Sequence, residues 1–372
     1  MSNSTKKKKN KTAAAVGRVF IVLGTFLALV FVWLYVTMFI FCHGPSESGR
    51  NLFVSTIRET GALRFLAKWY FSEEEILAIT SQDSMKANTE DTNTDLINIQ
   101  PKDDDDDPSD TNNTNDDPYK DNFDENGIEV INIAGRSFEA RLMKVKDPSK
   151  VFVGTIYPWR DLGLTLDELC ALNDAIGGVN GGEYESSGNS GGSPIGVVVS
   201  NGQIQWNSPQ YGDCLVGLTN ANILYIKDIS GYSAAQVEAL VAEQGIRDAV
   251  TFKDLIDSNV NHFTKLIVNG VATEFSGSGS GANPRTAIGQ RSDGTILLLT
   301  CDGRGAGGHI GATAADIIGI MQDYGAVNAA NLDGGSSSSM YYNGEWLQNS
   351  VTMYYATSSW RLPDGFLVKG AD

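Results

Sequence analysis

The sequence predicts an α+β domain with a mainly antiparallel or mixed sheet and flanking helices, preceded by one transmembrane helix. Three observations lead to this fold class. An uncharged apolar run lies near the N-terminus, short β-rich segments follow later in the chain, and isolated amphipathic helical patterns separate them. The regular strand–helix alternation of a doubly wound parallel sheet is absent, and we find no internal repeat.

The N-terminal region has the composition of a basic tail followed by a membrane anchor. Residues 1–18 contain a lysine cluster, and the 23 residues from Val19 to Phe41 carry no charge, so we predict a transmembrane helix over 19–42. A cleaved signal peptide usually has a shorter apolar core of ~7–15 residues and a small-residue cleavage site, which we do not find after the run. The positive-inside rule places the tail in the cytoplasm and residues 43–372 outside the cell.

Two segments separate the predicted anchor from the main domain. Residues 43–80 have a helical pattern, with Ser72 and Glu75 at capping-box spacing, and this membrane-proximal segment either packs near the membrane or pairs with a partner. Residues 81–126 hold fifteen acids against three lysines (3 − 15 = −12) and few apolar residues. This composition predicts a disordered acidic linker; a calcium-binding tract would need alternating ligands and a glycine.

Residues 127–372 have a globular composition and suffice for one domain. Their charge is 15 − 25 = −10, which disfavours nucleic-acid binding. Helices are predicted to begin after Thr165, Ser233 and Thr313. Thr165 and Ser233 are each followed three residues later by a polar capping partner, and Thr313 is followed by the apolar face of a helix. The predicted strands are "IEVINI", "FEARLMKV", "KVFVGTI", "IGVVV", "ILYI", "LIVNGVA", "TAIGQ" and "TILLLTC".

Four polar, glycine-bearing segments at the ends of predicted strands carry the candidate chemistry. They are "GGVNGGEYE" with Asn180, "GANPRTAIGQ" with Arg285, "LLLTCDGRGAGGHIGAT" with Asp302, and "NLDGGSSSSMYYNG" with Asp333. Glycines let a backbone approach a ligand closely, and serine hydroxyls add small donors. Each segment alone has an ordinary structural explanation as a turn or a surface ion pair. The sequence has four cysteines and no C-x-x-C pair, which argues against a zinc site or a disulfide framework.

Together, the four segments resemble the phosphodiester glycosidase family. The matching elements are "VNGG", "NPRTAIG" followed by "DG", "DGR" after an apolar strand, "NLDGG", and the closing "WRLPDGFLV", covering about residues 127–370. The anchor and acidic linker are similar to the layout of Gram-positive bacterial members. Two positions depart from the family pattern: Ser336 stands where a third glycine is common, and Glu183 where an aromatic residue is common.

The resemblance implies an extracytoplasmic hydrolase that cleaves the glycosidic bond of a sugar-1-phosphodiester in envelope or extracellular glycopolymers. Such a reaction is normally managed by two carboxylates, and arginine suits the phosphate. The expected catalytic residues are the carboxylate pair Asp302 and Asp333 and also Arg285, which with Arg304 would bind the phosphate; His309 is a further candidate proton carrier. The expected substrate-binding residues, which hold phosphate or sugar oxygens, are Asn180, Gly181, Gly182, Thr286, Arg304, Gly334, Gly335, Ser336 and Ser337.

No metal or other cofactor is expected, and the expected partner is a sugar phosphodiester or a phosphate-containing glycopolymer. Two other functions remain open at this stage. A non-catalytic glycopolymer-binding or envelope scaffold protein would keep the fold without turnover. A metal-dependent phosphodiesterase would cleave the P–O bond, although three histidines without a paired spacing make a poor dinuclear site. The sugar, the aglycone, the stereochemistry and the oligomeric state are not specified by the sequence.

Overall fold

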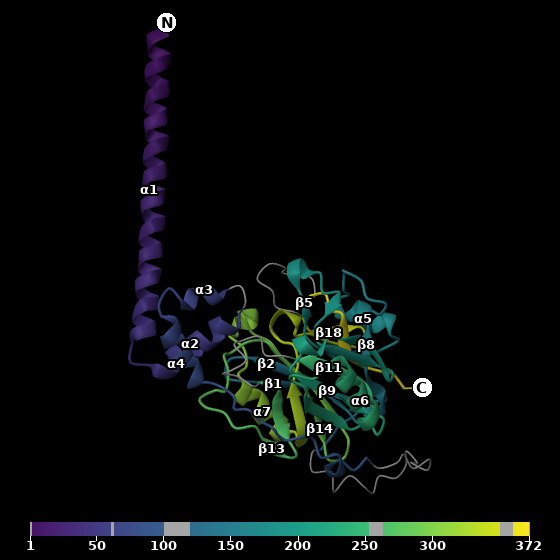
Figure 1. The fold of residues 1–372 in the computed structure, drawn as a ribbon. Helices are drawn as coiled ribbons and strands as arrows, with labels where there is room; N and C mark the ends of the chain where they lie inside the picture. Colours follow the sequence, from purple (N-terminus) through teal and green to yellow (C-terminus); the bar gives the residue numbers. More distant parts are fainter. Residues whose placement is uncertain (1, 61–62, 100–119, 253–262, 350–359, 372) are drawn as a thin grey trace.

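The computed structural model describes residues 2–60, 63–99, 120–252, 263–349 and 360–371. It has the predicted α+β class: every strand pair in the described residues is antiparallel, and helices flank the sheets. The long helix α1 (Ser2–His43) stands away from the rest of the protein (Figure 1). Its stretch Ala14–His43 is long and apolar enough to cross a membrane, and the structure buries none of its most apolar window.

Three short helices follow α1 and form a small helical unit with its C-terminal end. They are α2 (Glu47–Glu59), α3 (Arg64–Ala67) and α4 (Glu73–Ser81). Ser46 caps α2, and Ser72 forms a full capping box with Glu75 at the start of α4. The unit has its own apolar core, made by Cys42, Val54, Ile57, Ala67, Phe71, Ile76 and Ile79.

The main domain is built on three antiparallel sheets. The largest has the order β1-β2-β15-β14-β16-β12-β13. Its strands are β1 (Ile128–Ala134), β2 (Glu139–Val145), β12 (Lys265–Val268), β13 (Val271–Ala272), β14 (Arg285–Arg291), β15 (Ile296–Cys301) and β16 (Ala326–Asn331). The Asp293-Gly294 hairpin joins β14 to β15 as predicted, with Gly294 at φ +96°.

The two smaller sheets have five strands each. One has the order β10-β9-β11-β7-β8, and the other β18-β17-β4-β19-β3; β5 and β6 form a separate two-stranded ribbon. The bounds are β3 (Val151–Thr155), β4 (Gly177–Asn180), β5 (Tyr184–Glu185), β6 (Ser193–Pro194), β7 (Val197–Ser200), β8 (Gln203–Asn207), β9 (Cys214–Thr219), β10 (Leu224–Asp228), β11 (Ile246–Phe252), β17 (Met340–Tyr342), β18 (Glu345–Gln348) and β19 (Asp364–Val368).

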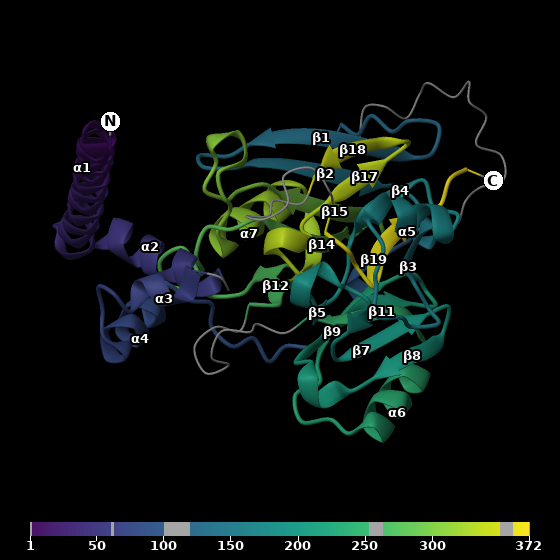
Figure 2. The same ribbon diagram turned by 90° about the horizontal axis from the view of Figure 1, so that it is seen from above.

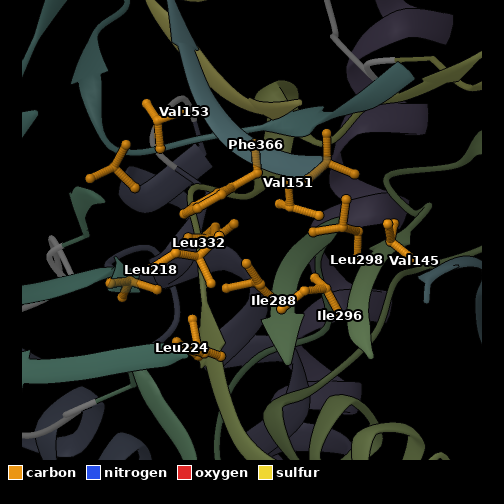
Figure 3. Close-up of a cluster of buried hydrophobic side chains, with 14 of the residues drawn as sticks. Val145, Val151, Val153, Leu218, Leu224, Ile288, Ile296, Leu298, Leu332 and Phe366 are labelled. Carbon is orange, nitrogen blue, oxygen red and sulfur yellow. The ribbon is translucent and has the colours of Figure 1, made fainter. Parts of the chain in front are cut away.

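The three sheets enclose one apolar core and each carries a helix on its outer face. Figure 3 shows Ile288 of the large sheet, Leu218 of the second and Phe366 of the third within the same cluster. Outside it, α7 (Ala314–Asp323), α6 (Ala234–Gln244) and α5 (Leu166–Leu172) pack with one sheet each in separate clusters (Figure 2). Burial of apolar area on both faces of every sheet therefore stabilises the domain.

The described parts of the predicted acidic linker pack against this domain. Met85 forms a β-bridge with Phe275, Lys265 Nζ donates to the carbonyl of Glu90, and the hydroxyl of Thr92 bonds to the backbone of β10. After residue 119, Asp121 forms ion pairs with the buried side chains of Lys144 and Arg291. The prediction of a disordered linker is therefore wrong for residues 81–99 and 120–126; its central part, 100–119, lies outside the described residues.

Candidate active site

The candidate site lies where strand ends of the largest sheet meet strand ends of the third. Asn331 at the end of β16 pairs with Ala287 near the start of β14, and Asn180 at the end of β4 pairs with Gly365 near the start of β19. Asn180 joins the two sheets, because its Nδ2 donates to the carbonyl of Asp333 (2.6 Å) and its Oδ1 accepts from the hydroxyl of Thr286 (2.7 Å).

Asp333 is the carboxylate at this junction. Its Oδ1 accepts from the backbone N–H of Gly334 (3.0 Å), and its Oδ2 accepts from the hydroxyl of Ser337 (2.5 Å), which also contacts the Tyr184 hydroxyl (2.8 Å). Burial raises the pKa of Asp333 to about 6, although these hydrogen bonds and the charge of Arg304 act in the opposite direction. A carboxyl with a pKa near neutrality can exchange a proton at physiological pH.

A second carboxylate, Asp364, lies next to Asp333 at the first position of β19. Its Oδ1 accepts from the N–H of Gly182 (2.8 Å), and a Cβ at Gly181 would come within 2.2 Å of that oxygen, so this position requires glycine. Its Oδ2 is buried without a hydrogen-bond partner among the described residues. Burial, and then the charge of Asp333, raises the pKa of Asp364 to about 7.

Arg304 supplies a positive charge to the same place. Its Nη1 donates to the hydroxyl of Ser336 (2.9 Å), while its Nε is buried with no partner in the part of the chain that the structure describes. Burial and the neighbouring Arg285 lower the pKa of Arg304 to about 10, against the attraction of Asp333 and Glu59. A Cβ at Gly335, which has φ +62°, would stand 2.7 Å from this guanidinium. Arg304 thus retains unused capacity to bind an anion.

Arg285, in contrast, is engaged by the protein itself. Its Nη2 donates to Glu59, to the Ser280 hydroxyl and to the Gly281 carbonyl, its Nε donates to a backbone carbonyl, and its guanidinium lies 4.4 Å from the ring centre of Phe263. Only 5% of the residue is exposed. The prediction that Arg285 clamps the substrate phosphate is therefore not supported by its surroundings, and we treat it as a residue that holds the loop before β14.

Glu59, the last residue of α2, was not found by sequence reasoning. Besides Arg285, its carboxylate accepts from the N–H of Gly281 (2.7 Å) and the side-chain amide of Asn283 (3.2 Å), while Thr56 one turn earlier accepts from Ala282 N–H (2.9 Å). No local pattern marks a glutamate on a helix more than two hundred residues before its partner. The helical unit is thereby fixed to the loop that precedes β14.

Replacing Glu59 with glutamine tests this attachment. The change leaves the buried Arg285 guanidinium without a counter-charge, so we expect the free energy of unfolding to fall by about 3 kcal/mol. Thermal unfolding of the full chain measures the effect. Glu47→Gln, at the exposed start of the same helix, is the matched control and should leave the Tm unchanged. Equal Tm values for the two variants would contradict the role given to Glu59.

The Asp302 carboxylate has partners of its own, so its expected catalytic pairing with Asp333 stays a prediction. The Asp302 carboxylate accepts from the N–H of Glu139 on β2 (2.7 Å) and contacts Nδ1 of His309 (2.7 Å). In the sheet, β2 lies on the side of β15 away from β14 and β16. In the described residues, β14 lies between β15, which precedes Asp302, and β16, which precedes Asp333. The Asp302–His309 pair is a separate feature.

Apart from Arg304, the expected substrate-binding residues divide into two groups: the buried polar side chains of Asn180 and Thr286, and the glycines and serines of the loops. Asn180 and Thr286 are completely buried and hold the Asp333 segment in place, so their assignment as substrate contacts stays a prediction. Gly181 accepts from the N–H of Asp333 (3.2 Å), and Gly335 N–H donates to a backbone carbonyl (2.8 Å). Ser337 orients Asp333, and Ser336 orients Arg304. The glycines and serines therefore shape the site and position its two charged groups.

Comparisons with known proteins agree with the resemblance seen in the sequence. A family model described as phosphodiester glycosidase matches residues 173–369. Among curated proteins, the SPbeta prophage-derived uncharacterized protein YomE of Bacillus subtilis is 45% identical over 67 residues, which is 18% of this chain and 10% of that protein. The match thus spans about a tenth of the length of this relative.

Two solved structures are similar in fold. The catalytic domain of zebrafish N-acetylglucosamine-1-phosphodiester alpha-N-acetylglucosaminidase, auto-inhibited by its pro-peptide, is 18% identical, with a TM-score of 0.49 over 66% of this chain and 82% of that one. A hypothetical protein from Synechocystis is 17% identical, with a TM-score of 0.41 over 65% and 61% of the two chains.

Proposed function

Because the chain belongs to the phosphodiester glycosidase family, we propose that it hydrolyses the bond between the anomeric carbon of a sugar and the oxygen of a phosphodiester. The observation that carries this proposal is the placement of Arg304, whose Nε has no partner in the described residues, near Asp333, which in turn lies beside Asp364. A cation for the phosphate and a carboxylate for the sugar carbon, supported by a second carboxyl group, are chemistry that suits this reaction.

In the proposed reaction, Arg304 binds the phosphodiester and neutralises the charge that grows on the leaving oxygen. The bond from the anomeric carbon to that oxygen breaks, and its electron pair remains on the phosphate. Asp333 in its ionised form stabilises the positive charge that develops on the sugar, and it accepts the proton of the attacking water. The products are a free sugar and a phosphate monoester, with the new oxygen on the sugar.

Asp364 has a supporting role in this proposal. It is almost fully buried, so it acts on Asp333 through charge and not by touching substrate. Two neighbouring carboxyl groups resist the loss of both protons. The pair therefore keeps one proton over the pH range in which Asp333 must accept a second proton. The Ser337 and Tyr184 hydroxyls form a hydrogen-bonded chain that leads to Asp333 and fixes its orientation.

We propose that the domain works outside the cell, anchored by α1. The basic residues before the apolar stretch and the scarcity of such residues just after it favour a cytoplasmic N-terminus. A bacterial envelope or extracellular glycopolymer with phosphodiester-linked sugars would then be within reach of the site. Digestion of intact cells by an added protease should remove the main domain, and complete protection would refute this orientation.

Product analysis with a sugar-1-phosphodiester separates the candidate functions. Free sugar plus a phosphate monoester supports the proposed glycosidase. Sugar-1-phosphate would instead indicate cleavage of the P–O bond by a phosphodiesterase, and binding without turnover would indicate a scaffold protein. The buried, ordered carboxyl pair favours the first outcome, because a protein that only binds a polymer gains nothing from two desolvated acids.

Asp364→Asn should change how stability depends on pH. A carboxyl whose pKa is raised on folding stabilises the protein below its unfolded pKa, and this contribution is lost as the pH rises through its folded value of about 7. We therefore expect the variant to be more stable than the wild type at pH 8, by about 2–4 kcal/mol, and similar at pH 4. Thermal unfolding at the two pH values measures this. The exposed Asp323→Asn is the control, and parallel curves for all three proteins would contradict the assignment.

A further inference from the structure

Aromatic residues of the helical unit contact α1 inside its uncharged run. We call residues 63–71, which include α3, the aromatic segment. The rings of Trp69 and Phe31 meet edge to face at 6.4 Å, and those of Tyr70 and Tyr35 stack at 5.3 Å. In Figure 1, α3 lies on the side of the helical unit toward which α1 rises. The aromatic segment therefore runs back along the helix that enters the membrane.

The position of these contacts along α1 gives their depth in the lipid bilayer. Phe31 lies ten residues before Phe41, the end of the uncharged run, which corresponds to ~15 Å along a helix. The hydrocarbon core of a bilayer is ~30 Å thick, so a span over this run places Phe31 well below its outer boundary. A side chain in contact with Phe31 then lies within the outer leaflet of the bilayer.

The exposed surface of the aromatic segment carries the residue types that proteins place at a membrane interface. Phe65 is 50% exposed and Trp69 48%, and the two rings contact each other at 5.4 Å. Arg64 and Lys68 flank them on the exposed side. Aromatic rings with long basic side chains are the residues that anchor proteins at the level of lipid headgroups.

Charge contributes little to this surface. Lys68 pairs with Glu73 at 2.5 Å, and Glu74 and Glu75 follow in the first turn of α4. The acidic residues offset the attraction of Arg64 and Lys68 for anionic lipids. Binding through this surface is thus expected from aromatic burial and should not require an acidic headgroup.

We propose that the aromatic segment is embedded in the outer leaflet of the lipid bilayer, with the Phe65 and Trp69 side chains in contact with lipid. The proposal rests on α1 being retained as a membrane span, and it commits to lipid as the occupant because the surface continues directly into the apolar surface of α1. Since α2 packs on α3 and Glu59 at the end of α2 binds Arg285, this contact would hold the candidate active site at a set height above the membrane.

The test places a fluorescent label at single cysteines in the full chain, reconstituted in phosphatidylcholine vesicles that contain a spin-labelled phosphatidylcholine quencher. The four native cysteines are buried, which favours labelling of the added one. Phe65→Cys and Trp69→Cys report on the aromatic segment. Leu27→Cys within α1 is the membrane reference, and Tyr211→Cys, at a 60% exposed residue of the main domain, is the aqueous reference.

We expect the loss of fluorescence at positions 65 and 69 to approach that at position 27, with none at position 211. The same result should hold when anionic phosphatidylglycerol is added. Quenching at position 27 but not at 65 and 69 would overturn the proposal and leave the anchor intact. No quenching at position 27 would overturn the proposal as well, because α1 would then not span the membrane. Neither result bears on the glycosidase activity, which is measured separately.

Discussion

Asp333→Asn is expected to lower kcat and kcat/KM together by roughly 10²–10⁴-fold on a sugar-1-phosphodiester, with little change in substrate affinity. The amide keeps the size of the side chain and accepts the hydrogen bond from Gly334 N–H, but it cannot carry the charge that stabilises the transition state or take a proton from water. Steady-state kinetics on the purified full chain, with the fold checked by circular dichroism, measure the change.

The control for this variant is Asp302→Asn. Its carboxylate binds the β2 backbone and His309, away from Asp333, so the change should cost less than about tenfold if the assignment is correct. The two variants therefore distinguish our assignment, in which Asp333 acts without Asp302, from the Asp302–Asp333 pair expected from the sequence. A loss of activity in Asp302→Asn as large as that in Asp333→Asn would restore the sequence-based pair, and full activity of Asp333→Asn would refute our assignment.

Arg304→Ala is expected to lower kcat/KM for the phosphodiester by about 10²–10³-fold. The guanidinium is the cation with unused donors beside Asp333, so its loss removes both ground-state binding of phosphate and stabilisation of the leaving group. A substrate with the same sugar and a neutral activated leaving group should be affected far less. Arg304→Lys should recover only part of the activity, because a point charge replaces a planar fork.

Arg160→Ala, which removes an exposed arginine, controls for the loss of one positive charge and should leave both substrates unaffected. An equal loss for Arg304→Ala on the charged and the neutral substrate would mean that Arg304 only supports the loop through Ser336. The phosphate-binding role would then be wrong, although the role of Asp333 would stand.

Elements with strong local signals could be predicted from the sequence. The capping residues Ser72, Thr165, Ser233 and Thr313 all stand at the start of helices in the structure. The apolar run before Asp302 forms the interior strand β15, and the Asp293-Gly294 turn connects it to β14. Such features are set by short-range hydrogen bonding and by apolar periodicity, which a single sequence displays.

The remaining site residues depend on contacts between distant parts of the chain. Asp364 is a lone acid at the start of an apolar strand, and only the pairing of β19 with β4 brings it beside Asp333. The partner of Arg285 is Glu59 on a helix outside the main domain. The acidic linker was mispredicted for the same reason: Asp121 appears solvated by composition, yet two buried cations, Lys144 and Arg291, neutralise it.

The position of bond cleavage tests the central claim most directly. Hydrolysis of a sugar-1-phosphodiester in water enriched in oxygen-18, followed by mass spectrometry of the phosphate product, reports which bond breaks. Attack at the anomeric carbon, with Arg304 binding the leaving phosphate, predicts free sugar and a phosphate monoester without the heavy isotope. Incorporation of oxygen-18 into the phosphate, together with sugar-1-phosphate as product, would mean that water attacks phosphorus, and it would contradict the glycosidase mechanism.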